Sequence, residues 1–230
     1  MDRRFVVCSG LLMTAFAGFV NAVSFKELGG LFISFASGAS ISIGADFEQG
    51  EFEACYRASI LVAAFVAAAM LASMIKRPRG YLRSAVLLAA EATLLSGTVV
   101  LVRKGMTPDI AVIPAIAAMG VQNTILQSAT GMRSGGTFVT GTLVGLGEAL
   151  GNALSGGSRW SWLHNLCVWT SFLAGAVAGA RAQRTYGFFA LVAPAGGIAF
   201  VCLVAVALAL FNSWKQTDEP PASPHAPESV

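Results

Sequence analysis

The sequence predicts an all-α membrane protein, with one transmembrane domain (residues 1–211) and a disordered tail (residues 212–230). Three observations predict this fold class. Hydrophobic residues make up 55% of the 230 residues and charged residues only 12%, whereas a soluble domain carries about 25% charged residues. The mean hydropathy is +0.68. Six apolar runs each have about the 20 residues that a helix needs to cross a bilayer.

The six runs are predicted to be transmembrane helices, because hydrocarbon offers no partner to an unpaired backbone amide or carbonyl. They are Phe5–Phe25, Ala54–Ile75, Tyr81–Val102, Pro108–Ser128, Trp160–Ala180 and Tyr186–Phe211. The lipid bilayer is therefore the first expected partner. The net charge of +3 is too small to indicate an anionic partner such as nucleic acid.

Two shorter segments lie between these runs, at Leu31–Gly44 and Thr137–Gly151. Both are rich in Gly, Ser and Thr, and both are too short to cross comfortably alone. We expect re-entrant or broken segments, which are tolerated only where protein or a water-filled cavity covers them.

The distribution of Lys and Arg predicts the orientation. With six crossings and a cytoplasmic N-terminus, more basic residues lie on the cytoplasmic side than outside, which is the usual bias. Eight crossings remove this bias. We therefore expect six crossings in a multi-pass protein of the cell (inner) membrane.

The tail holds Pro220, Pro221, Pro224 and Pro227 among polar residues, a composition typical of disorder.

An internal repeat is indicated by two pairs of short motifs. Gly18-Phe19-Val20-Asn21 recurs as Gly120-Val121-Gln122-Asn123, and Phe35-Ala36-Ser37-Gly38 recurs as Phe138-Val139-Thr140-Gly141. The offsets are 120 − 18 = 102 and 141 − 38 = 103 residues. The halves, about 5–102 and 108–211, would each hold three crossings. An odd number inverts the second half relative to the first, which is a plan used by many transporters.

At these motifs the chain resembles the YoaK family of bacterial membrane proteins, which is defined by a domain of unknown function. The second-half pieces, Met119–Asn123 and Val139–Leu143, match well. In the first half, Asn21 stands where the family usually has an acidic residue, and Ser37-Gly38-Ala39 stands where it has Thr-Gly-Asn. The resemblance implies an integral, inner-membrane protein of about six spans, and it implies no particular substrate.

Side-chain amides within the spans are the first candidates for a functional site. Asn21, Gln122 and Asn123 lie in apolar helices, where an amide facing lipid is costly. They therefore face protein or water. One interpretation is that they bind a polar solute or ion. The other is that they form hydrogen bonds between helices, each contributing roughly 0.6–2 kcal/mol.

Small polar residues of the two short segments are the second group of candidates. Hydroxyls and carbonyls at a helix break can replace the hydration shell of a solute, and glycine lets the backbone approach it. They can equally satisfy backbone groups that the break has freed. This group consists of Ser37, Gly38, Ser40, Thr137, Thr140, Gly141 and Thr142.

Glu91 is the third candidate, near the middle of the Tyr81–Val102 run. No basic residue lies within a turn or two of it in sequence. A carboxylate there takes up a proton or points into a wet cavity, and such acids mark functional sites by default. The alternative is a neutral acid that is hydrogen-bonded to a neighbouring helix.

Enzyme signatures were not found: the sequence has no HExxH, GxSxG or Walker motif, and no ligand pattern for a metal or cofactor. Three small-xxx-small patterns begin at Gly141, Gly147 and Gly175, and they permit close helix contacts within the chain or in a homo-oligomer.

The sequence favours a small transporter or channel-like permease for a small polar solute. The alternative is a non-transporting scaffold whose polar motifs hold its helices together.

Overall fold

The computed structural model describes residues 3–28, 30, 33–34, 36–75, 81–130 and 138–218. Within these ranges every regular element is a helix, so the predicted all-α class is confirmed. The elements are α1 (Arg3–Glu27), α2 (Ala36–Glu48), α3 (Phe52–Met74), α4 (Tyr81–Arg103), α5 (Pro108–Ala111), α6 (Ile113–Thr130), α7 (Phe138–Leu154), α8 (Trp162–Tyr186), the 3₁₀ turn η1 (Gly187–Leu191) and α9 (Val192–Asp218).

Five segments of the described chain are long and apolar enough to cross a membrane. The first four coincide with α1, α3, α4 and α5–α6. The fifth, Trp162–Phe211, has 50 residues and takes in both α8 and α9. Large hydrophobic side chains such as Val66, Met70 and Leu203 are exposed on the outer helix faces, as expected where lipid is the solvent. The chain is an integral membrane protein.

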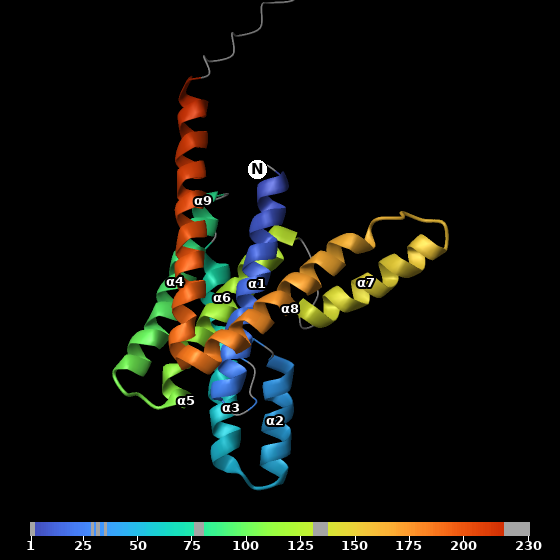
Figure 1. Cartoon of the computed structure of the whole chain (residues 1–230). Helices are drawn as coiled ribbons and strands as arrows, with labels where there is room; N and C mark the ends of the chain where they lie inside the picture. Colours follow the sequence, from blue (N-terminus) through green and yellow to red (C-terminus); the bar gives the residue numbers. More distant parts are fainter. Residues whose placement is uncertain are drawn as a thin grey trace, which may run out of the picture.

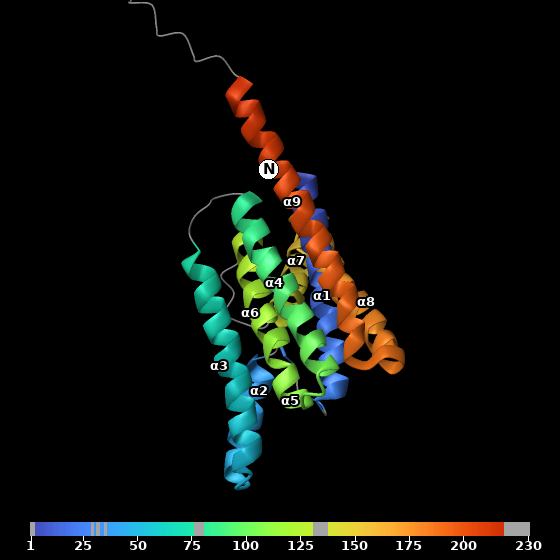
Figure 2. The ribbon, with the colours of Figure 1, turned by 90° about the vertical axis from the view of Figure 1, so that its left-hand side faces the viewer.

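The core is a bundle of α1, α4, α6 and α9 (Figures 1 and 2), in which α4 packs against both α6 and α9. Its main cluster combines fully buried apolar residues of all four helices and of η1, among them Val20, Leu95, Ile116, Leu191 and Ile198. The start of α1 and the last turns of α9 lie at the same end of the bundle.

Two further helices flank this core, because α8 packs along α1 and α3 packs along α6. Glycine permits both contacts. A Cβ atom at Gly18 would collide with the main-chain oxygen of Phe172, and one at Gly120 would collide with that of Phe65. The helix backbones therefore approach more closely than larger side chains allow.

The two short predicted segments overlap the unbroken helices α2 and α7, which end after Gly44 and Gly151 respectively (Figure 1). The expected break therefore does not lie within either helix. With 13 residues, α2 is about 20 Å long at 1.5 Å per residue, too short to cross alone. It packs on α3, and this hairpin extends beyond the rest of the bundle; α7 packs on α8 and forms an arm to one side (Figure 1).

The last two long helices end later than predicted. α8 continues to Tyr186, and the chain turns at Gly187, whose φ of 54° is readily adopted only by glycine. Arg181 and Arg184 lie between the predicted runs Trp160–Ala180 and Tyr186–Phe211, and they are exposed on the final turns of α8. Basic residues near a helix C-terminus interact favourably with the helix dipole. α9 extends beyond Phe211 to Asp218, and residues 219–230 of the predicted tail lie outside the described residues.

Candidate functional site

Glu91 lies in the middle of α4 and is completely buried. Neither of its carboxyl oxygens has a hydrogen-bond partner in the described part of the chain. Leu88 and Leu95, one turn to either side on the same face, belong to the main core cluster. This candidate therefore points into the bundle core, and the neighbouring-helix hydrogen bond considered as its alternative role is not formed within the described residues.

Gln122 connects two core helices. Its side chain is 1% exposed, and its Nε2 donates a hydrogen bond to the main-chain oxygen of Met13 at 2.8 Å, which joins α6 to α1. Its Oε1 is buried without a hydrogen-bond partner among the described residues. The amide nitrogen thus makes a structural contact, whereas the amide oxygen makes none within the described residues.

Asn123 makes a more local contact, because its Nδ2 donates to the oxygen of Met119 in its own helix at 2.8 Å. Gly120, one turn earlier on the same stripe, lies against α3. Asn123 therefore faces away from the helix to which Gln122 binds, and it remains partly buried.

Asn21 holds the chain that follows α1. Its Nδ2 donates to the main-chain oxygen of Ala17 at 2.8 Å and to the Ser34 hydroxyl at 2.6 Å. Its Oδ1 accepts a hydrogen bond from the backbone N–H of Ser34 at 3.2 Å. Its amide is thus committed to the fold, although the sequence allowed a role in ligand binding.

The small polar residues of the short segments do not gather around Glu91. Ser37 and Ser40 are exposed on α2, and the Ser40 hydroxyl bonds to the oxygen of Ala36 in its own helix. Gly38 is partly buried. On α7, Thr140 is exposed, Gly141 is partly buried and Thr142 is 5% exposed. α2 and α7 lie on different sides of the bundle (Figure 1), and Thr137 lies outside the described residues.

Two further core residues resemble Glu91 and were missed by the sequence analysis. Thr98 and Ser24 are 0% exposed, and their hydroxyls have no hydrogen-bond partner in the described ranges. Thr98 stands seven residues after Glu91 and Ser24 stands three residues after Asn21, so both share a helix face with a predicted candidate. That spacing was the signal that could have found them.

Only some of the predicted small-xxx-small patterns pack against another helix within the described residues. Gly175 and Gly179 lie against the backbone of α1, and Gly145 lies against Asn165 of α8. Around Gly147 and Gly151, in contrast, nothing described lies within 4 Å of an added Cβ atom. Within the residues the structure describes, no group of three side chains could hold a metal ion.

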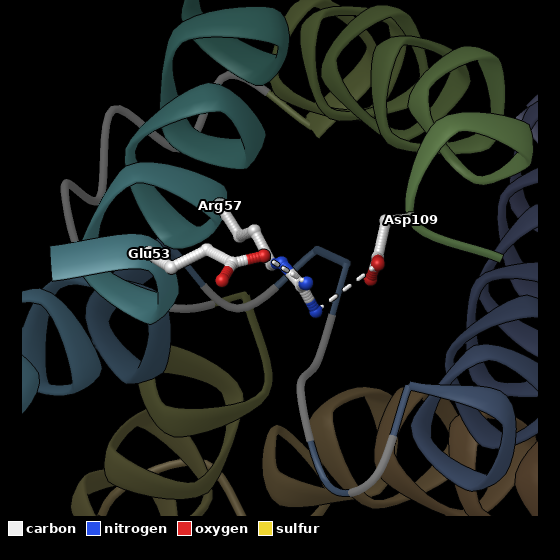
Figure 3. A network of polar contacts seen from close by, with 3 residues as sticks. All are labelled: Glu53, Arg57 and Asp109. Atoms are coloured by element: carbon white, nitrogen blue, oxygen red, sulfur yellow. Dashed lines mark hydrogen bonds and ion pairs between the residues drawn. The ribbon is translucent and has the colours of Figure 1, made fainter. Parts of the chain in front are cut away.

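An ion-pair network joins α3 to α5 at the end of the bundle (Figure 3). The Arg57 guanidinium contacts Glu53 in its own helix and the Asp109 carboxylate at 3.2 Å. About half of the Arg57 and Asp109 side chains is exposed, at 50% and 47%. This network connects helix ends at the surface, and it is separate from the buried Glu91.

Comparison with known proteins places the chain in a family. The model of DUF1275, described as a protein of unknown function, matches residues 9–205, so the chain belongs to this family and its resemblance to YoaK proteins is confirmed. The chain is also 28% identical over 202 residues to a UPF0700 transmembrane protein of Rhizobium meliloti (strain 1021), covering 86% of this chain and 84% of that protein. No solved structure matches the chain.

Proposed function

We propose that this member of the DUF1275 family is a small transporter or channel-like permease for a small polar solute, located in the inner membrane with a cytoplasmic N-terminus. The observation that carries the proposal is Glu91, a carboxyl group that is fully buried at mid-helix without a hydrogen-bond partner in the described chain. Burying such a group inside a membrane protein costs free energy, and membrane-embedded acids usually mark substrate or ion pathways.

The proposed path follows the core of α1, α4, α6 and α9, with Glu91 and Gln122 beside it. Counting α8 and α9 as separate crossings gives six, which fits the start of α1 and the end of α9 at one end of the bundle. Six crossings divide into two halves of three, and these halves are inverted relative to each other.

Matched glycine contacts support the proposed inverted repeat. Gly18 meets the main-chain oxygen of Phe172 and nitrogen of Ala176, which are four residues apart on α8. Its counterpart Gly120 meets the same two kinds of atom at Phe65 and Ala69, four residues apart on α3. The first crossing helix of each proposed half thus packs on the second crossing helix of the other half, as a pseudo-two-fold axis requires.

Swelling of proteoliposomes tests the transport proposal. Vesicles with the full chain, exposed to gradients of urea, glycerol or ammonium, should swell faster than protein-free vesicles, and Glu91→Gln should abolish the difference. Glu148→Gln is the matched control, because it makes the same carboxyl-to-amide change on an exposed residue of α7. Equal swelling with and without wild-type protein for every solute would reject the proposal.

The second candidate function is a membrane scaffold, and the contacts of Asn21 favour it, because this amide is committed to Ala17 and Ser34. In such a scaffold, the open face of α7 at Gly147 and Gly151 would bind a second copy of the chain. Absent solute flux together with a stable oligomer in mild detergent would favour this function over transport.

A further inference from the structure

The bundle core contains five oxygen atoms for which the described chain supplies no hydrogen-bond partner: Ser24 Oγ, both carboxyl oxygens of Glu91, Thr98 Oγ1 and Gln122 Oε1. Each of these side chains is 0–1% exposed. Leaving a buried polar group unpaired costs roughly 1–3 kcal/mol, and more for a charged group. Such a set therefore points to a partner that the polypeptide does not provide.

Glu91 and Gln122 lie at nearly the same depth in the bundle. A Cβ atom at Gly97 of α4 would lie 3.7 Å from the Pro114 Cβ of α6, which aligns these two antiparallel helices. Six residues back along α4 is Glu91, and six residues forward along α6 is Gly120. Gln122 is two residues further, about 3 Å along the axis at 1.5 Å per residue.

The two side chains also enter the same core. Leu88 and Leu95, which flank Glu91, belong to one cluster with Met119, which precedes Gln122 by one turn. Met13, whose main-chain oxygen accepts the Gln122 hydrogen bond, belongs to that cluster too. Helix neighbours of both Glu91 and Gln122 thus belong to the same buried cluster of the bundle.

The chemistry of these atoms limits which class of ligand can bind to them. All five are oxygens, and Glu91 is the one acid among the buried residues described. The elements that pack against α4 supply no counter-charge: α6, η1 and the Val192–Phe211 part of α9 contain no Asp, Glu, His, Lys or Arg, and α5 adds only the carboxylate of Asp109, which pairs with Arg57. The other titratable group on these elements is Cys202, whose thiol donates to the oxygen of Ala85. A single carboxylate among neutral oxygens suits a hard cation that carries one positive charge.

We propose that Glu91 and Gln122 form a monovalent-cation site, which takes either a proton or Na⁺. Thr98 and Ser24 mark the route to it, because they lie further along α4 and α1 toward the end of the bundle where both helices terminate. The inference rests on the proposed transport function, in which this cation is the coupling ion, and it assigns that function's central site a ligand class.

Thermal unfolding of the full chain in detergent tests the site. Na⁺ replaces choline at constant ionic strength, and the series is repeated at acidic and alkaline pH. A sodium site raises the wild-type midpoint in Na⁺ at alkaline pH by about 5 °C or more. A proton site leaves the midpoint insensitive to Na⁺ and raises it on acidification. Glu91→Gln should remove either dependence, and Glu148→Gln should preserve it.

A wild-type midpoint that responds to neither cation overturns the inference, as does a Glu91→Gln protein that keeps the wild-type response. If Glu91→Gln does not fold, infrared spectra of the wild type decide. The carbonyl band of a buried protonated carboxyl group should be present at acidic pH and should disappear on alkalinisation or on Na⁺ addition. If this band is absent under all conditions, and the unfolding midpoint also does not respond to Na⁺, the site is rejected. Cation-dependent stability without solute flux would reject transport and retain the site; flux with a cation-independent midpoint would do the reverse.

Discussion

Gln122 and Met13 are joined by a hydrogen bond of 2.8 Å from the side-chain amide of one to the main-chain oxygen of the other. This contact connects the first crossing helix of each proposed half of the chain, and Gln122 is almost fully buried there. A structural bond and an unpartnered oxygen thus occur within a single amide group.

Replacing Gln122 with Met removes both features together. The lost hydrogen bond destabilises the protein, whereas removal of the unpartnered Oε1 offsets part of that loss. We expect the free energy of unfolding to change by less than about 1 kcal/mol. Reversible unfolding in mixed micelles measures it, with Ile125→Met on the same helix as the control. A loss above about 3 kcal/mol would show that Oε1 has a strong structural partner.

Asn21→Leu should be much more damaging. It removes three hydrogen bonds and leaves the backbone N–H and hydroxyl of Ser34 unpaired. The expected cost is about 2–4 kcal/mol, with increased proteolysis in the connection between α1 and α2. Thr93→Val provides a comparison, since the Thr93 hydroxyl bonds only within its own exposed helix turn. Equal stability of the two variants would contradict the anchoring role of Asn21.

Gly18→Leu should prevent the normal packing of α1 on α8, because even a Cβ atom collides with the Phe172 main-chain oxygen. We expect a loss of folded protein in fluorescence-detected size-exclusion chromatography. Gly147→Leu is the matched control, since an added Cβ there meets nothing described within 4 Å. Normal folding of the monomer with Leu at both positions would refute the close approach of α1 to α8.

Arg57→Ala should have a small effect, although it breaks contacts to two carboxylates (Figure 3). Ion pairs at the surface contribute little to stability, and salt screens them. The melting midpoint should therefore fall by only a few degrees, with a smaller difference at high salt. A large, salt-independent fall would indicate that α5 depends on this pair for its position.

The sequence was sufficient to predict the membrane class and most long helices, because apolar length alone decides which segments cross a bilayer. It could not predict the turn at Gly187, since Arg181 and Arg184 interrupt the apolar pattern without interrupting α8. Glu91 could be singled out from the sequence because a charge in the middle of an apolar helix is conspicuous, and the structure buries it in the bundle core.

The roles of the amides were less predictable. Asn21 and Ser34 are thirteen residues apart, a separation set by the path of the connecting chain and by no helical period. Gln122 and Asn123 are adjacent in sequence, yet one reaches α1 and the other bonds within its own helix. Only the packing of three helices around α6 distinguishes them.

The contact between Gly18 and Phe172 has a consequence for biosynthesis. α1 leaves the ribosome before α8, which carries the backbone against which α1 fits. Until α8 has been inserted, Gly18 lacks the neighbour that it has in the folded protein. Packing of α1 is therefore completed only after α8 has entered the membrane, and a chain truncated before α8 leaves α1 without its partner.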